Sequence, residues 1–192
     1  MMKRLFLAIS LPDEERKALS YETDAIEGEL PEELNPRASG PDKLHFTIIF
    51  LDSQEEEAIP IIVKAMEKTA SEMSPFEVKV TKIDYNSGKP EKRMVWAYGE
   101  APQMSVLRDR LSEALIGEGL AFPKFRDELH PHITLVRFEP REEGGLPKLT
   151  ADLDMKFTAG SVELIESEWP DGDEYHEVAS VKFGGPVNRL ER

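Results

Sequence analysis

The chain of 192 residues contains no cysteine, which excludes disulfides and thiol chemistry. No apolar run approaches the roughly 20 residues needed to cross a bilayer, so we expect no membrane partner and a cytoplasmic location. Basic residues are outnumbered, with 24 Lys and Arg against 38 Asp and Glu, a net charge of −14. Proteins that coat long nucleic acid neutralise phosphates with Lys and Arg. The charge therefore argues against binding to long duplexes but allows a local basic pocket for one phosphate.

Histidine is scarce too, with four in the chain, yet His130 and His132 both stand in the single stretch HPHITLVRF (130–138). The rest of this stretch is typical of a buried β-strand, because Ile, Leu, Val and Phe fill sheet cores. By itself this stretch supports no more than a strand that carries histidines, because a histidine on a strand is usually structural.

Hydrophobic periodicity predicts about seven strands and three helices in mixed order, an α+β fold. The expected strands are 4–9, 44–51, 76–83, 94–98, 132–138, 157–166 and 177–183, and the expected helices are 12–26, 55–73 and 102–116. The segments 28–43, 84–92 and 141–154 are predicted loops, the last with one short helical turn, and a turn is expected around 170–172. No linker is long enough to separate domains, so we interpret residues 1–192 as a single domain.

The chain also contains an internal repeat. LHFTIIFL (44–51) and PHITLVRF (131–138) align without gaps, and each reads His, an apolar residue, Thr and then an apolar strand. Their histidines are 132 − 45 = 87 positions apart. The repeat predicts two lobes of antiparallel sheet related by a pseudo-twofold axis, with helices packed outside. Since side chains two apart on a strand share a face, the polar residues at 45–48 and 132–135 would meet in a central cleft.

Two histidines that face each other are suited to general acid–base catalysis. Their unperturbed pKa lies near neutrality, so one can be neutral and the other protonated at about pH 7. We expect His45 and His132 to be the catalytic pair, while the hydroxyls of Thr47 and Thr134 hold the oxygens of a central phosphate. In-line displacement at phosphorus needs one proton-transfer group on each side. Such a site requires neither a metal nor a cofactor.

Other residues are weaker candidates for substrate binding. His130 has no counterpart in the first motif and is expected near the phosphate or behind the catalytic pair. Arg137 has the opposite strand parity to His132 and would point away from the cleft, unless a bulge turns it back. Lys43, Lys92 and Arg126 are expected in loops near the cleft mouth, where they would attract an anionic substrate. Tyr85 and Phe125 are candidates for stacking on a base.

With both motifs identified, the sequence resembles the 2H phosphoesterase superfamily, and within it the RNA 2′,3′-cyclic phosphodiesterase family, also called 2′-5′ RNA ligase. LHFTIIFL and HPHITLVRF resemble its two signature motifs. RLFLAISLP (4–12) is similar to its opening strand, RMVWAYGE (93–100) to its middle strand and ESEWPDGDEYHEV (166–178) to its closing segment. The resemblance covers nearly the whole chain.

The resemblance implies a bilobal fold and metal-independent opening of a 2′,3′-cyclic phosphate to a 2′-phosphomonoester. In this scheme His45 donates a proton to the leaving 3′ oxygen and His132 activates water. The implied partners are RNA ends or small nucleotides that carry a 2′,3′-cyclic phosphate, and we expect a monomer. The chain departs from the family pattern at 37–44, RASGPDKL, which lacks an aromatic residue common there, and at Ile49, where lysine is common.

Three alternatives stay open at the level of sequence. His45, His130 and His132 could together hold a metal such as zinc. A protein that only binds RNA ends would also use a phosphate pocket, although binding alone needs no matched acid and base. Ligation of RNA ends is formally the reverse of diester hydrolysis in the same site.

Overall fold

The structure is a computed structural model that describes residues 1–125, 128–149, 151–168 and 174–184. Its strands are β1 (Met2–Ser10), β2 (Arg37–Ala38), β3 (His45–Glu55), β4 (Phe76–Tyr85), β5 (Glu91–Glu100), β6 (His132–Glu142), β7 (Ala151–Ala159), β8 (Ser161–Ser167) and β9 (Tyr175–Lys182). The α-helices are α1 (Asp13–Glu29), α2 (Ile59–Ser71) and α3 (Pro102–Gly117). Short 3₁₀ helices are η1 (Glu32–Leu34), η2 (Pro41–Lys43), η3 (Glu56–Ala58) and η4 (Glu143–Gly145).

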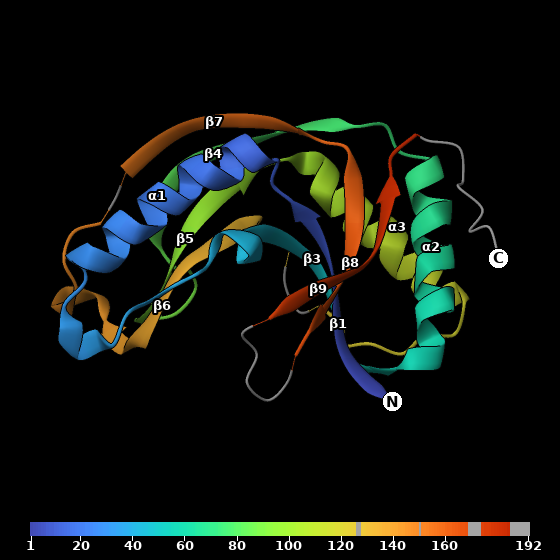
Figure 1. Cartoon of the computed structure of the whole chain (residues 1–192), viewed down its shortest axis with the longest axis horizontal. Coiled ribbons are helices and arrows are strands. Elements are labelled where there is room, and N and C mark those ends of the chain that lie inside the picture. Colours follow the sequence, from blue (N-terminus) through green and yellow to red (C-terminus); the bar gives the residue numbers. More distant parts are fainter. Residues whose placement is uncertain (126–127, 150, 169–173, 185–192) are drawn as a thin grey trace.

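The strands form two antiparallel sheets. Sheet A has the order β3-β1-β8-β9, and sheet B has the order β2-β6-β5-β4-β7. Helix α1 packs against β2 and β6 of sheet B, whereas α2 contacts β8 and β9 and α3 contacts β3 of sheet A. Figure 1 shows α1 over one sheet and α2 and α3 beside the other. The predicted α+β class, with antiparallel sheets and helices outside, is confirmed.

The helices begin where local chemistry favours them. Pro12 precedes α1, and Asp13, Glu14 and Glu15 place negative charge at the positive end of the helix dipole. Pro60 lies in the first turn of α2, where its missing N–H costs no hydrogen bond. None of the described helices is long and apolar enough to span a membrane.

The sequence prediction was wrong about the segment 157–166, which we expected to be one strand. The chain breaks at Gly160, because β7 pairs with β4 in sheet B while β8 pairs with β1 in sheet A. Gly160 is therefore the crossing point between the two sheets, and both sides of it have strand-like sequence. This split, together with the short β2 inside a predicted loop, raises the strand count of the described chain to nine.

Two predicted loops are shorter than expected. β4 and β5 continue into 84–92 and leave only 86–90 between them, and β6 and β7 continue into 141–154. The predicted helical turn there is η4, and the expected turn around 170–172 lies outside the described residues. The extended strands are held by backbone pairing to their neighbours, which composition does not reveal.

Candidate active site

The two His-x-Thr motifs begin the equivalent strands β3 and β6. Over the first seven residues both strands follow one pattern: the first and third residues are half-buried, the sixth is exposed and the others are buried. His45 and Thr47 therefore share one face of sheet A, and His132 and Thr134 share one face of sheet B. We call these faces, which lie opposite the helices, the motif faces. Strands β3 and β6 contact each other, and His132 is close enough for its charge to act on His45, although 87 positions separate the two histidines (132 − 45).

His45 is enclosed by aromatic rings of sheet A. The ring of Phe6 on β1 stacks on it with centroids 4.9 Å apart, and the ring of Tyr175 on β9 meets it edge-on at 5.6 Å. Its Nε2 lies 3.1 Å from the hydroxyl of Thr47, and its Nδ1 is fully buried. These contacts fix the plane of the His45 ring and direct its Nε2 toward the hydroxyl of Thr47 in the same motif.

His132 is fixed by an aromatic stack and by a backbone carbonyl. The indole of Trp96 on β5 stacks on its ring at 3.7 Å, and its Nδ1 lies 2.7 Å from the carbonyl oxygen of His130. Because a carbonyl only accepts hydrogen bonds, Nδ1 carries the proton and donates. In the neutral ring Nε2 then holds the free lone pair. The geometry prepares His132 to accept a proton.

Both histidines have lowered pKa values. Burial lowers the pKa of His45 from its ordinary 6.5 to about 4, and the positive charges of Arg137 and His132 act in the same direction, against the carbonyl of Lys43, which raises it. Burial also lowers the pKa of His132, with contributions from His130 and Arg137, while the His130 carbonyl raises it. Burial and the positive charge of Arg137 therefore disfavour the predicted state with one protonated ring at neutral pH in the free protein. The sequence alone shows neither the burial of the rings nor the nearby guanidinium.

Arg137 faces the site, contrary to its parity. Thr134 pairs with Trp96 and Val136 with Val95, so Leu135 is an extra residue that forms a β-bulge. The bulge reverses the alternation and brings Arg137 to the motif face, where its charge lowers the pKa of both motif histidines, His45 and His132.

The first motif has the same irregularity. Thr47 pairs with Ala8 and Ile49 with Leu7, so the extra residue is Ile48. Phe50, the counterpart of Arg137, is brought to its own motif face and is 58% exposed. The two halves of the site therefore differ, with an apolar ring on one side and a cation on the other.

The structure separates the other predicted binding residues. His130 is exposed and contributes its carbonyl rather than its ring. The amine of Lys43 lies 6.0 Å from the ring centroid of Tyr175, next to His45. Phe125 packs on Phe122 and on Arg108 of α3, and in the described part of the chain its ring contacts neither motif histidine, so its predicted stacking role is not supported. Arg126 lies outside the described residues.

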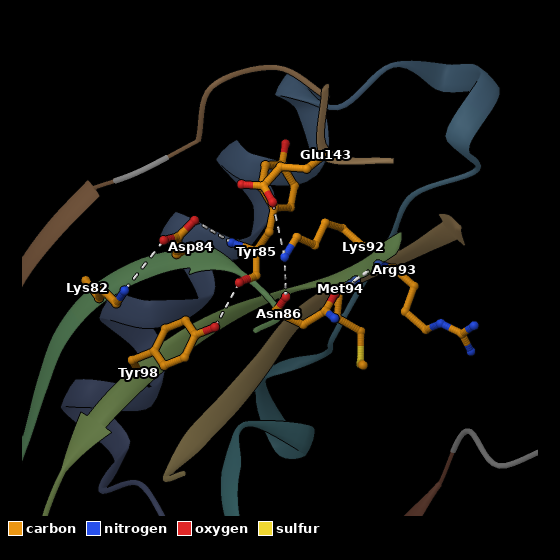
Figure 2. Close-up of polar contacts among 9 residues, drawn as sticks. All are labelled: Lys82, Asp84, Tyr85, Asn86, Lys92, Arg93, Met94, Tyr98 and Glu143. Carbon is orange, nitrogen blue, oxygen red and sulfur yellow. Dashed lines mark hydrogen bonds and ion pairs between the residues drawn. The ribbon is translucent and has the colours of Figure 1, made fainter. Parts of the chain in front are cut away.

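Lys92 and Tyr85 belong to a group of polar contacts around the β4–β5 hairpin (Figure 2). The Lys92 amine donates to the backbone carbonyl of Asn86 and forms an ion pair with Glu143 at 3.3 Å. The Tyr85 hydroxyl donates to the carbonyl of Pro147. Both side chains are buried in the hairpin between β4 and β5, so the prediction that Lys92 lies at the cleft mouth is wrong, and the buried ring of Tyr85 is not available to stack on a base. The Asn, Gly and Pro residues of 84–92 predict a loop, whereas both ends of this segment are paired in β4 and β5.

The described residues do not bring His45, His130 and His132 together as metal ligands. The one group of three that is close enough consists of Glu168, Glu174 and His176, all exposed. This group lies at the outer end of β8 and β9 and contains neither motif histidine. The geometry gives no support to the zinc alternative.

Comparison with known proteins identifies the family. Residues 14–169 match the model of the 2′-5′ RNA ligase superfamily. The chain belongs to this superfamily. Over 142 residues it is 30% identical to a Thermus thermophilus protein named RNA 2′,3′-cyclic phosphodiesterase, covering 70% of this chain and 68% of that protein. A Bacillus subtilis protein of the same name is 30% identical over 101 residues, which span 52% of this chain and about half (54%) of that relative.

Solved structures of other proteins share the fold. TT0787 of Thermus thermophilus superposes with a TM-score of 0.78 at 25% identity, covering 95% of this chain and 98% of that one. E. coli LigT, solved in complex with 3′-AMP, gives a TM-score of 0.68 at 22% identity with 95% and 98% coverage. The second likeness concerns the fold alone, because its sequence identity is low.

Sequence reasoning missed the rings that hold the histidines. Phe6 lies in RLFLAI, where both strand faces are apolar, so no alternation marks the ring that turns to the motif face. Trp96 gave a clearer signal, since Met94, Trp96 and Tyr98 alternate along MVWAY. That pattern identifies a large-residue face but does not reveal that it lies beside His132.

Proposed function

We propose that this superfamily member hydrolyses 2′,3′-cyclic phosphates of RNA ends or nucleotides to 2′-phosphomonoesters, using His132 as general base and His45 as general acid. The observation that carries the proposal is the pair of His-x-Thr motifs on adjoining strands of two sheets, with each histidine fixed by an aromatic ring. The names of the two relatives at 30% identity support the same reaction for this chain.

The reaction follows from the two ring nitrogens. His132 accepts a proton from water through Nε2, which the His130 carbonyl leaves unprotonated. The water oxygen attacks phosphorus opposite the 3′ oxygen, the bond from phosphorus to that oxygen breaks, and His45 gives it a proton. The 2′ oxygen keeps the phosphate. His132 ends protonated and His45 neutral, and exchange with solvent restores the starting state.

The low pKa of His45 makes proton donation dependent on substrate. In the free protein, burial and the charge of Arg137 favour the neutral ring. A phosphate anion between the motifs stabilises a nearby imidazolium and raises its pKa. Arg137 and the hydroxyls of Thr47 and Thr134 would hold the non-bridging oxygens, and Lys43 would attract the anion. The acid is then charged only when a substrate is present.

Hydrolysis of a nucleoside 2′,3′-cyclic phosphate in excess chelator tests the proposal directly. The expected product is the 2′-phosphate, identified by ³¹P NMR, and His45→Ala and His132→Ala should each lower the rate about 10²–10⁴-fold. His176→Ala, on the exposed surface, is the matched control and should retain activity. A 3′-phosphate product, activity that disappears with chelator, or an unaffected His45→Ala variant would overturn the mechanism. Tight binding without turnover would instead favour an RNA-end binder.

A further inference from the structure

Two arginines stand side by side on the motif face of sheet B. Arg37 of β2 is the direct cross-strand partner of Arg137 of β6, and directly opposite side chains in an antiparallel pair share a face. The next pair, Ala38 with Val136, has the other orientation: Val136 is buried and the amide of Ala38 donates to Glu27 of α1. Since the bulge brings Arg137 to the motif face, Arg37 lies on that face too.

This arginine pair is not neutralised by the protein. Like charges directly opposite each other destabilise a sheet, and the chain has 38 acidic residues that could compensate them. In the described residues neither arginine forms an ion pair with a carboxylate, and the recorded hydrogen bond of Arg137 goes to the sulfur of Met94. By contrast, Arg16 and Arg110 pair with Asp13 and Glu72. Both members of the pair are exposed, so an anion from solution can reach them.

The two arginines lie where a second phosphate of the substrate, next to the reacting one, would be placed. The charge of Arg137 acts on both catalytic histidines, so its guanidinium lies beside the reacting phosphate of the proposed function. Arg37 is one strand further out, about 5 Å away at the backbone, on the edge strand of sheet B. In an RNA end with a cyclic phosphate, the next phosphate is attached to the 5′ oxygen of the same ribose. Two neighbouring cations match two phosphates one nucleotide apart.

We propose that Arg37, supported by Arg137, binds the phosphate on the 5′ side of the terminal nucleotide. This inference rests on the proposed function and adds the substrate class: the site takes RNA ends or 5′-phosphorylated nucleotides in preference to nucleosides that carry only the cyclic phosphate. A charge-assisted hydrogen bond is worth about 1.5–3 kcal/mol. The 5′-phosphate should therefore raise kcat/KM about 10- to 100-fold.

Three substrates and matched variants test the subsite. The substrates are adenosine 2′,3′-cyclic phosphate, the same molecule with a 5′-phosphate, and a dinucleotide ending in a cyclic phosphate. The measured quantity is the ratio of kcat/KM with and without the 5′ group, for the native protein and for Arg37→Ala, Arg37→Lys and Arg110→Ala. Arg110 is the control, because it is a surface arginine on α3. Binding of adenosine 2′-phosphate with and without a 5′-phosphate, measured by calorimetry, gives a readout independent of turnover.

We expect a ratio well above one that falls to about one in Arg37→Ala, is partly kept in Arg37→Lys and is unchanged in Arg110→Ala. The salt dependence of log kcat/KM for the dinucleotide should become shallower by about 0.7 in Arg37→Ala. A native ratio near one, or a ratio that Arg37→Ala leaves unchanged, overturns the subsite even if the plain cyclic nucleotide is hydrolysed. If no substrate is hydrolysed the proposed function fails, and unequal calorimetric affinities would still report the subsite. A ratio high for the 5′-monoester alone identifies nucleotides rather than RNA ends as its ligand.

Discussion

Acidification should destabilise the folded protein through His45, and the structure gives the size of the effect. In the unfolded chain this ring takes up a proton below about pH 6.5, but in the folded protein only below about pH 4. Between these values the unfolded state binds more protons, so the free energy of unfolding falls as the pH falls. The stability is fully present above pH 6.5. At pH 5 the two pKa values correspond to a loss of about 2 kcal/mol, an upper limit because the ring is only half-buried.

Urea unfolding at pH 8, 6.5 and 5, for the native protein and for His45→Gln, measures this contribution. The variant lacks the titrating ring, so its stability should fall between pH 8 and pH 5 by about 2 kcal/mol less than that of the native protein. His132 and Glu163 are present in both proteins, so their contributions to the pH dependence of stability cancel in this comparison. His132 acts in the same direction as His45, whereas burial raises the pKa of Glu163 and gives the opposite pH dependence.

Thr47→Val is the control for damage to the site. It removes the hydrogen bond to His45 but keeps the ring, so it should show nearly the full loss at acid pH whatever its stability at pH 8. Equal losses for the native protein and His45→Gln would refute the reasoning, because they would mean that solvent reaches the ring freely in the folded state. The low pKa of the proposed general acid would then have no structural basis.

Arg137→Ala removes a charge that lowers the pKa of His45 and His132, the proposed acid and base, so the pH of maximal kcat/KM should move upward while the maximum itself falls; an optimum that stays in place would contradict the electrostatic argument. Trp96→Leu removes the ring stacked on His132 and should lower kcat by up to about tenfold, from a stacking energy of about 0.5–1.5 kcal/mol. Trp96→Phe keeps a ring and discards a buried indole N–H that has no acceptor in the described structure, so it should keep most of the activity, and similar losses in both variants would refute the stacking role. Gly99→Ala would place a methyl carbon 2.6 Å from the buried ring of Phe46 and should cost about 1–3 kcal/mol in urea unfolding; unchanged stability would show that the ring can move aside.

The elements that sequence predicted well are those with strong local signals. Strand β6 was identified from HPHITLVRF because branched and aromatic residues dominate it, and α3 from its leucine spacing and Pro102. The split at Gly160 was missed because strand-like residues continue on both sides of it. Only pairing with different sheets ends one strand there, and pairing is a property of distant segments.

The sequence by itself determined which residues are candidates for the chemistry: two His-x-Thr strands, no cysteine, and a repeat from which we predict an acid and a base. The tertiary structure decided which residues act with them. Strand parity predicts that Arg137 points away, and a single extra residue at Leu135 turns it back to join Arg37 and lower the pKa of both histidines. Parity, stacking and burial all depend on which strand lies next to which. That is why the candidate residues could be identified from the sequence, whereas their orientation and protonation could not.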